Sequence, residues 1–377
     1  MNNFVKPFPN PIHVTRPILP DISKVNKIIE TIWESKQLTN SGIMAQTLEK
    51  ELSHFLKVDN LSLFCNGTTA LQLACKALRL TGEVITTPFT FAATPHAISW
   101  CGLEPVFCDI EGDTFNLDPE KIEELITPRT SAILPVHVFG IPCRLGRIQE
   151  IADKYALKVV YDAAHAFGVE IGGKSIGSFG NISMFSFHAT KVFHTIEGGA
   201  LAFESSSLKQ RSDLLRNFGI VNEDCIIEAG TNGKLNELQS AVGLLVLELI
   251  CGEIAERKRL TFLYRELLKD IPGIGFCNDM ENVTHNYNYF VITVDKAEFG
   301  HSRDELLQTL RKYNVYARKY FYPLNSHLPC YRNRPSANST NLPVAEKAAD
   351  MTLALPLYGE LAEYEVETIC TVIKHTH

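Results

Sequence analysis

The sequence predicts an α/β protein with a mostly parallel sheet in a large domain and a small α+β domain at the C-terminal end. Short apolar runs alternate with amphipathic stretches from about residue 60, which is typical of βαβ units. The chain has 377 residues, too many for one small core. A long helical pattern then precedes the last hundred or so residues. We expect the large domain, with an N-terminal arm, over residues 1–250 and the small domain over residues 251–377.

The alternation predicts individual strands and helices. A predicted strand over 61–64 is followed by a helix over 70–80, and a strand over 104–109 is followed by an amphipathic stretch over 119–126. A strand over 131–136 is then followed by a helix over 144–155, and a further strand covers 157–161. Residues 168–186 are rich in Gly and Ser and predict a β-hairpin. A helix over about 237–268 bridges the domains. The small domain then starts with a strand over 289–294, a helix over 302–313 and a strand over 315–320.

Composition and charge narrow the class of protein. Hydrophobic residues make up 45% and charged residues 21%, as in ordinary globular proteins, and the net charge of -7 argues against general affinity for nucleic acid or anionic membranes. Ten cysteines are scattered without a Cys-x-x-Cys pair, which predicts free thiols in a reducing compartment and no metal site. Residues 1–20 contain five prolines, and no segment is apolar for eighteen residues. We therefore expect a cytoplasmic protein.

One lysine stands out as a candidate for chemistry. The run Ser186-Phe187-His188-Ala189-Thr190-Lys191 is followed by Glu197-Gly198-Gly199, so a lysine lies near a hydroxyl, an imidazole and two glycines. A lysine that forms a Schiff base must lose its proton near neutral pH, which requires partial desolvation. The glycines allow the backbone to approach a flat ligand. Alone, the run also fits a strand and a loop with a solvated lysine.

Asp162 directly follows the predicted strand 157–161, so it lies where a parallel strand ends. Ligands of open α/β sheets bind at that edge. A carboxylate there can pair with a protonated pyridine nitrogen and keep a pyridoxal ring electron-withdrawing. His165, three residues later, can hydrogen-bond a ring substituent. The alternative for Asp162 is a helix cap or turn.

Asn66-Gly67-Thr68 follows the first predicted strand and opens a helix. Free backbone N–H groups, a glycine and hydroxyls at a helix N-terminus suit a phosphate, although an ordinary capped helix has the same pattern. Phe91 follows another strand and can stack on a planar ring, whereas core packing explains a single phenylalanine equally well.

One segment matches a phosphate-binding motif by its letters but not by its structural context. Residues 168–175 match the phosphate-binding pattern G-x-x-x-x-G-K-S letter for letter. That loop joins a strand to a helix, but the following residues 176–181 include two glycines and do not readily open a helix. We predict a hairpin turn with an exposed Lys174.

The motifs together resemble one family, the nucleotide-sugar aminotransferases of the DegT/DnrJ/EryC1/StrS group, over about Val14 to Glu367. The features that match in order and spacing are Gly67-Thr68, Phe91, Asp162 to His165, Ser186 to Lys191, and Glu197-Gly198-Gly199. The resemblance implies the aspartate-aminotransferase fold, type I, with pyridoxal 5'-phosphate as cofactor.

The resemblance also assigns roles to residues of this chain. Lys191 would carry the cofactor as a Schiff base and move the proton during the reaction, Asp162 would hold the pyridine nitrogen, and Phe91 would stack on the ring. His165 would lie near the ring hydroxyl. The residues implied for the phosphate are Gly67, Thr68 and Ser186.

Further assignments concern the substrate and a second subunit. Asn232 resembles the asparagine that reaches the phosphate of a neighbouring subunit, which implies a homodimer with shared sites, although the family usually has an aromatic residue where this chain has Gly233. Tyr322 and His327 resemble a small-domain segment that closes over the sugar. Asn40 resembles part of an N-terminal substrate loop, and His188 is a further candidate substrate contact.

The resemblance implies a transaminase that takes the amino group of L-glutamate and passes it to a dTDP-keto-sugar. Overall likeness favours carbon 4 of dTDP-4-keto-6-deoxyglucose, giving dTDP-4-amino-4,6-dideoxyglucose for surface polysaccharides such as O antigen. Carbon-3 amination and the galacto-configured carbon-4 product stay open. Sugar dehydration is disfavoured, because relatives that dehydrate carry histidine in place of Lys191. A regulatory or binding protein on an inactive scaffold is the alternative from another class, but it should have lost the lysine or the aspartate.

Overall fold

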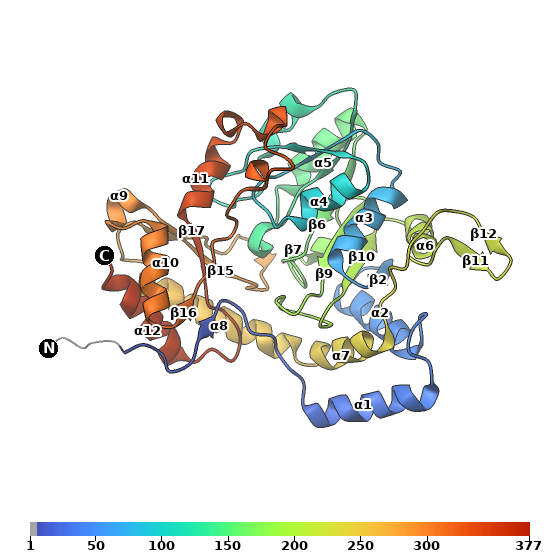
Figure 1. Ribbon diagram of the computed structural model, residues 1–377, viewed down its shortest axis with the longest axis horizontal. Helices are drawn as coiled ribbons and strands as arrows, with labels where there is room; N and C mark the ends of the chain where they lie inside the picture. Colours follow the sequence, from blue (N-terminus) through green and yellow to red (C-terminus); the bar gives the residue numbers. More distant parts are fainter. Residues whose placement is uncertain (1–5) are drawn as a thin grey trace.

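The computed structural model describes residues 6–377, so residues 1–5 of the predicted arm and large domain lie outside the described part. A seven-stranded sheet forms the centre of the larger part of the molecule (Figure 1). In spatial order its strands are β2 (Leu61–Phe64), β10 (Gly199–Phe203), β9 (Ile182–Ser186), β6 (Lys158–Asp162), β5 (Thr130–Leu134), β3 (Glu83–Thr86) and β4 (Glu104–Phe107). Only β10 runs antiparallel to its neighbours among these seven, which confirms the predicted mostly parallel sheet.

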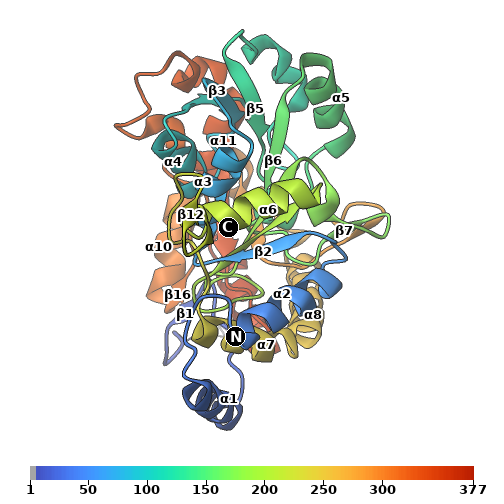
Figure 2. The ribbon, with the colours of Figure 1, turned by 90° about the vertical axis from the view of Figure 1, so that its right-hand side faces the viewer.

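Helices cover both faces of this sheet. Successive strand residues point to opposite faces, so Val84 and Val160 pack with α3, α4 and α6, whereas Ile85 and Val159 pack with α5. Figure 2 shows α5 on one side of β3, β5 and β6, and α3 and α4 on the other. The helices are α3 (Gly67–Ala77), α4 (Ala93–Trp100) and α6 (Ser206–Leu215) on one face, α2 (Ile43–Phe55), α5 (Leu145–Tyr155) and α7 (Glu237–Leu247) on the other, and α1 (Ile22–Ser35), which packs on α7.

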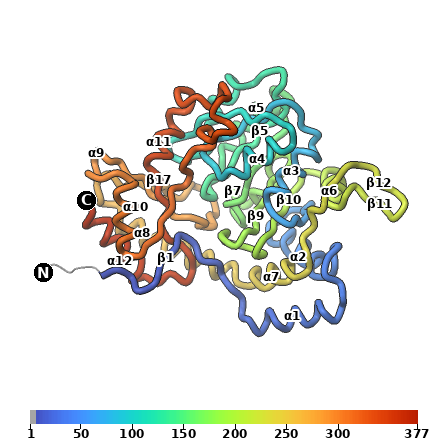
Figure 3. The backbone as a smooth tube through the Cα atoms, viewed as in Figure 1, coloured from blue at the N-terminus to red at the C-terminus, as the bar shows by residue number. Residues whose placement is uncertain are grey.

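The C-terminal residues build a second core. A three-stranded antiparallel sheet packs with α8 (Ile250–Leu268), α10 (Arg303–Lys312) and α12 (Glu363–Lys374). Its strands are β13 (Ile274–Phe276), β15 (Phe290–Val294) and β17 (Thr352–Leu355). The N-terminal arm runs to this core (Figure 3). There β1 (Ile12–His13) pairs in parallel with β16 (Val315–Tyr316), and Phe8 is buried. The division of the chain at residues 250 and 251 stays a prediction.

Three predicted elements differ from the structure. The expected helix over 237–268 is two helices, α7 and α8, bent by 58° at their break, because α7 packs on the larger core and most of α8 on the smaller one. The stretch 119–126 forms two 3₁₀ turns, Pro119–Lys121 and Glu123–Leu125. The strand expected over 315–320 is limited to the two residues of β16. No single helix within residues 6–377 has the length and apolarity of a membrane span, while the bent α7–α8 pair meets those two criteria jointly.

The glycine-rich segment forms the predicted hairpin. β7 (Glu170–Ile171) and β8 (Lys174–Ser175) are antiparallel, and Gly172 and Gly173 take the positive φ angles of 55° and 80° that the turn needs. A short 3₁₀ turn (Ile176–Ser178) follows instead of a long helix. Lys174 is exposed, so the rejection of a phosphate-binding loop agrees with the structure.

The remaining elements are short. They are the hairpin β11 (Ile220–Asn222) and β12 (Cys225–Ile226), β14 (Val283–Thr284), α9 (Lys296–Phe299), α11 (Pro343–Met351), and the 3₁₀ turns Val138–Gly140, Asn325–His327, Pro335–Ala337 and Ser339–Asn341. Helix α10 begins with the predicted capping box, in which Ser302 and Glu305 bond each other's backbone N–H groups.

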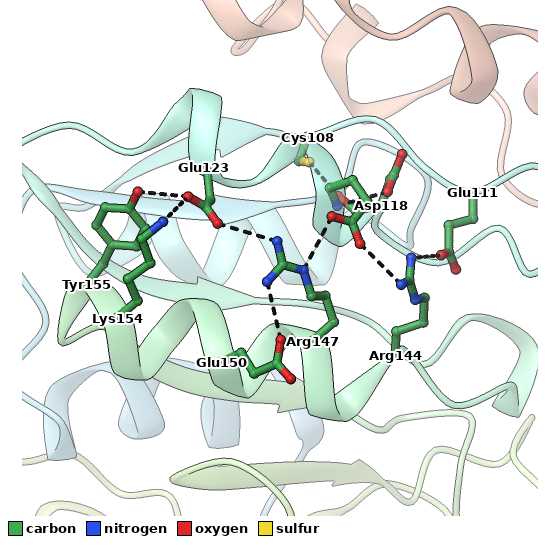
Figure 4. A network of polar contacts seen from close by, with 10 residues as sticks. Cys108, Glu111, Asp118, Glu123, Arg144, Arg147, Glu150, Lys154 and Tyr155 are labelled. Carbon is green, nitrogen blue, oxygen red and sulfur yellow. Dashed lines mark hydrogen bonds and ion pairs between the residues drawn. The ribbon is translucent and has the colours of Figure 1, made fainter.

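A network of ion pairs connects the outer face of α5 to the two 3₁₀ turns near residue 120 (Figure 4). Arg147 contacts Glu120, Glu123 and Glu150, and Lys154 contacts Glu123 at 2.6 Å. Most of these side chains are well exposed, and exposed pairs contribute only about 0–1 kcal/mol each. The position of α5 therefore depends mainly on its buried residues, such as Ile148 and Ile151, and not on this network.

Candidate active site

Asp162 is the last residue of β6 and is 4% exposed. Thr94, on α4, donates its hydroxyl to Oδ2 at 2.7 Å, and the backbone N–H of Ala164 donates to Oδ1 at 3.0 Å. Burial raises the pKa of Asp162, and these hydrogen bonds together with the nearby Lys191 partly oppose that effect. A buried carboxylate held this way is suited to a cationic partner such as a pyridinium.

Lys191 lies in the irregular segment between β9 and β10 and is partly buried. Burial lowers the pKa of its amine to about 8, although Asp162 and Tyr320 both favour the charged form. Its Nζ lies 6.0 Å from the ring centre of Tyr289. A substantial fraction of the amine is therefore unprotonated slightly above neutral pH, as a Schiff-base lysine requires.

His165 is buried among aromatic rings close to both groups. Its ring is nearly parallel to those of Phe139 and Phe321 and perpendicular to Tyr289. Burial, followed by the charge of Lys191, places the pKa of His165 well below its ordinary value, so the ring is neutral. Because Nδ1 accepts the N–H of Phe139 at 3.2 Å, we assign the ring proton to Nε2.

The N-terminus of α3 meets the end of β9. Asn66 caps the helix by accepting the N–H of Thr69 at 2.8 Å. A Cβ added to Gly67 would lie 3.2 Å from the Cβ of Ser186, and one added to Gly199 would lie 2.9 Å from the backbone of Gly67. The two glycines thus permit a close approach, which brings the helix N-terminus next to the Ser186 hydroxyl, an arrangement suited to a phosphate.

Phe91 is 64% exposed, although it lies only three residues before Thr94, the partner of Asp162. Asn325 fixes this loop by donating its side-chain amide to the carbonyls of Pro88 and Thr90, at 3.1 and 2.7 Å. An exposed ring on a fixed loop near a buried carboxylate fits a face that stacks on a flat ligand. The residues present therefore fit pyridoxal phosphate at its nitrogen, its phosphate and its ring face.

The other predicted residues lie at the surface. His188 is exposed, with Nδ1 2.8 Å from the hydroxyl of Thr190 and Nε2 3.5 Å from Glu197. Asn232 is exposed next to Gly233, whose carbonyl accepts the N–H of Cys65. Asn40 is exposed with a positive φ of 62° in the turn before α2.

The two small-domain candidates have partners of their own. The Tyr322 ring lies under Lys319 and Arg303, whose cationic groups are 4.3 and 5.3 Å from its centre. His327 bonds Glu346 at 2.7 Å. Their proposed contacts with the sugar stay predictions. The tyrosine that raises the pKa of Lys191 is Tyr320, two residues earlier.

Sequence reasoning missed several residues of the site. Thr94 lies three residues after Phe91 in the sequence, but no pattern of residues indicates its contact with Asp162. Tyr289, Asn286 and Asn288 come from the small-domain half of the chain, and no motif or spacing marks them. Within residues 6–377, no group of three or more His, Cys, Asp or Glu side chains could hold a metal ion.

Comparison with known proteins adds independent evidence. Residues 21–374 match the model of the DegT/DnrJ/EryC1/StrS aminotransferase family. The dTDP-4-amino-4,6-dideoxy-D-glucose transaminase of Escherichia coli is 47% identical over 96% of this chain and 98% of its own length. The transaminase of the same name from Shigella dysenteriae is 46% identical over 97% and 98%.

A solved structure agrees with the sequence match. The crystal structure of DesI in the presence of its TDP-sugar product superposes with a TM-score of 0.94 at 35% identity, covering 98% of this chain and 94% of that chain. The family model, the relatives and the fold thus indicate the same family as the cluster around Lys191 and Asp162. The chain belongs to the DegT/DnrJ/EryC1/StrS aminotransferase family.

Proposed function

We propose that this aminotransferase uses pyridoxal 5'-phosphate to transfer the amino group of L-glutamate to carbon 4 of dTDP-4-keto-6-deoxy-D-glucose. The product would be dTDP-4-amino-4,6-dideoxyglucose, a precursor of bacterial surface polysaccharide such as O antigen. The observation that carries the proposal is the amine of Lys191, whose pKa burial lowers to about 8, beside the buried carboxylate of Asp162. The transaminases that are 46–47% identical favour the same sugar position.

The residues around the sheet edge fit the cofactor part by part. Asp162, oriented by Thr94, would pair with the ring nitrogen, and Phe91 would cover one face of the ring. When bound, the cofactor supplies an electron-withdrawing ring that stabilises negative charge on the adjacent carbon. The phosphate would be bound by the α3 N-terminus and the hydroxyls, through Gly67, Thr68 and Ser186.

Lys191 would hold the cofactor at rest and would then act as acid and base. It would take a proton from the carbon of the amino donor, and in the second half-reaction it would give a proton to the carbon that becomes aminated. Such exchange is efficient when the pKa of the group is close to the working pH, and a value of about 8 meets that condition. His165 and His188 would orient the ring hydroxyl and the sugar.

We also propose a homodimer with shared active sites. Asn232 lies at the base of the β11–β12 hairpin, which projects from the rest of the molecule (Figure 1). Exposed apolar side chains on and beside this hairpin would be covered by a second copy; they are Phe218, Val221, Ile226 and Ile227. A monomer in sedimentation experiments at micromolar concentration would contradict this part of the proposal.

The decisive experiment gives the purified protein pyridoxal phosphate, L-glutamate and dTDP-4-keto-6-deoxyglucose, with the product determined by NMR. An amine on carbon 4 supports the proposal, and the ring couplings distinguish gluco from galacto. Amination that appears only after a 3,4-ketoisomerase is added would make this a carbon-3 enzyme.

The matched pair of variants is Lys191→Ala and Lys174→Ala. We expect Lys191→Ala to lose turnover by about 10⁴-fold and Lys174→Ala to keep it, because Lys174 lies on the exposed hairpin turn. Borohydride should fix the cofactor to the peptide that contains Lys191. Substantial transamination by Lys191→Ala would overturn the assignment.

A further inference from the structure

A fully buried asparagine contacts the segment that carries Lys191. The side-chain Oδ1 of Asn288 accepts the backbone N–H of Val192 at 3.1 Å, and Asn288 is 0% exposed. Val192 immediately follows Lys191 in an irregular segment, so this bond ties the lysine's own backbone to a residue nearly a hundred positions later. A buried N–H without a partner is costly, so the bond constrains this part of the segment strongly.

Asn288 is itself held from behind by a buried ion pair. Arg257, 1% exposed on α8, donates to the carbonyl of Asn288 at 3.1 Å and pairs with Glu253 one helical turn away. Glu253 also accepts the N–H of Gly359 at 2.9 Å. Replacing a buried ion pair by apolar residues is often neutral or stabilising, so stability alone does not account for this pair. Its geometric effect is to fix the backbone of Asn288.

The same segment also fixes the other side of the site. The N–H of Asn288 donates to the side chain of Asn286, whose amide donates to the carbonyls of His165 and Phe167 at 2.8 and 2.9 Å. The next residue, Tyr289, places its ring beside both Lys191 and His165. One short stretch of chain therefore sets the relative position of the lysine and the histidine.

We propose that Asn288, held by the Glu253–Arg257 pair, is a positioning residue that keeps the Lys191 amine in its partly desolvated place. The inference rests on the proposed role of Lys191. Asn288 acts through the backbone of Val192 and touches no reacting atom. Loosening this contact would let water reach the amine, so the ammonium form would be favoured again.

The test measures Lys191 directly, without turnover. The full-length chain, freed of cofactor, is treated with an amine-acylating reagent over a range of pH, and the modification of the Lys191 and Lys174 peptides is quantified by mass spectrometry. In the parent protein we expect the midpoint for Lys191 near 8. Leucine is similar in size to asparagine but lacks the acceptor, so in Asn288→Leu we expect this midpoint to rise by about one pH unit or more. In steady-state kinetics, kcat should fall by a larger factor than the factor by which the KM for the sugar changes.

Two further variants separate positioning from general loss of stability. Arg257→Lys should move the Lys191 midpoint in the same direction, and it also serves if Asn288→Leu does not fold. Arg303→Lys is the matched control, because Arg303 is also buried and donates to the carbonyls of Ala349 and Thr352, and not to Asn288 or Val192. It should lower the melting temperature and leave the midpoint unchanged.

The outcomes distinguish this inference from the proposed function. An unchanged midpoint in folded Asn288→Leu or Arg257→Lys would overturn the positioning role while leaving the lysine's role intact. A parent protein in which the Lys191 midpoint lies at the ordinary value of a lysine, about 10.4, would contradict the proposed function instead. An equal shift in Arg303→Lys would make the effect one of stability and would overturn the inference.

Discussion

Two regions enclose the Lys191 amine, and they are built in different ways. The first is the edge of the large sheet, where Asp162 and Ser186 are the last residues of β6 and β9. The second is the small-domain side, where Asn288 and Tyr289 precede β15 and Tyr320 follows β16. At the sheet edge, topology alone places the side chains together. On the small-domain side, individual hydrogen bonds do so.

The two regions differ in what fixes the position of each side chain. A parallel strand delivers its last residue to the edge whatever the neighbouring loops do, so the chemistry there depends on residue type. Asn288 and Tyr289 depend on Arg257 and on the packing of α8, which also belongs to the smaller core. We therefore expect substitutions at the sheet edge to remove chemistry and substitutions on the small-domain side to misplace it.

Among substitutions of the residues that surround Lys191, the largest effect should come from Asp162→Asn. The amide keeps the shape and an acceptor for Thr94 but removes the charge that would pair with the ring nitrogen. Losing one partner of a buried charge pair costs about 3–5 kcal/mol, so kcat should fall by about 100-fold or more while cofactor affinity falls less. Steady-state kinetics with saturating cofactor would measure the change.

The matched control is Asp109→Asn. Asp109 also follows a strand of the large sheet, β4, and is buried, but it pairs with Lys121 and accepts the N–H groups of Val344 and Ala345 at the start of α11. This variant should lose stability and keep its kcat per folded molecule. If both variants lost kcat equally, the strand-end position of Asp162 would carry no special chemistry.

The sequence predicted part of the site but not all of its contacts. Alternating apolar and amphipathic runs predicted the parallel sheet, and the strand-end positions indicated Asp162 and the Gly67 loop. Lys191 was indicated by the hydroxyl, imidazole and glycines near it in the sequence. The sequence could not indicate Thr94's bond to Asp162, or the approach of Asn288 and Tyr289. The approach of Asn288 and Tyr289 depends on α8, and the 58° bend between α7 and α8 was concealed by a continuous apolar periodicity over 237–268. A local pattern cannot specify which of two cores each half of a helix packs against.

A smaller effect should follow from Tyr289→Phe. The hydroxyl of Tyr289 is close to Tyr320 and Thr190, whose side chains influence its pKa, and its removal leaves the ring beside the Lys191 amine in place. A typical net hydrogen bond contributes about 0.5–1.5 kcal/mol, so kcat should fall by about threefold to tenfold. We expect the pH profile of kcat to shift as well, since the surroundings of the lysine change.

Tyr287→Phe supplies the comparison for that variant. Tyr287 is two residues earlier, and its hydroxyl donates to Asp279 at 2.7 Å at the surface, away from Lys191. Its kcat and pH profile should match those of the parent. If Tyr289→Phe kept the kcat and the pH profile of the parent protein, the hydroxyl of Tyr289 would have no role in the reaction, and only its ring would matter.

The last expected effect concerns stability in acid, not activity, and again separates the two regions. His137, whose N–H donates to the carbonyl of Asp162, is 0% exposed, and burial lowers its pKa to about 3; the pKa of His165 is also well below its ordinary value. The unfolded chain binds protons at these histidines below about pH 6.5, whereas the folded chain does not, so stability is complete above that pH and falls as the pH drops toward 3. The expected slope is about 1.4 kcal/mol per pH unit for each histidine.

Denaturant unfolding at pH 7 and pH 5.5 would measure this loss, and His137→Asn would reduce the slope. Asparagine can still accept the N–H of Cys143, which His137 Nδ1 accepts at 3.1 Å, but it does not titrate. Hydrogen exchange would locate the effect, with protection decreasing in acid around β6 and residues 136–139 before it decreases in β15. Because β15 contains no histidine, and His285, whose pKa burial also lowers, lies outside it, equal early loss in β15 would mean that the sheet edge is not the acid-sensitive part of the site.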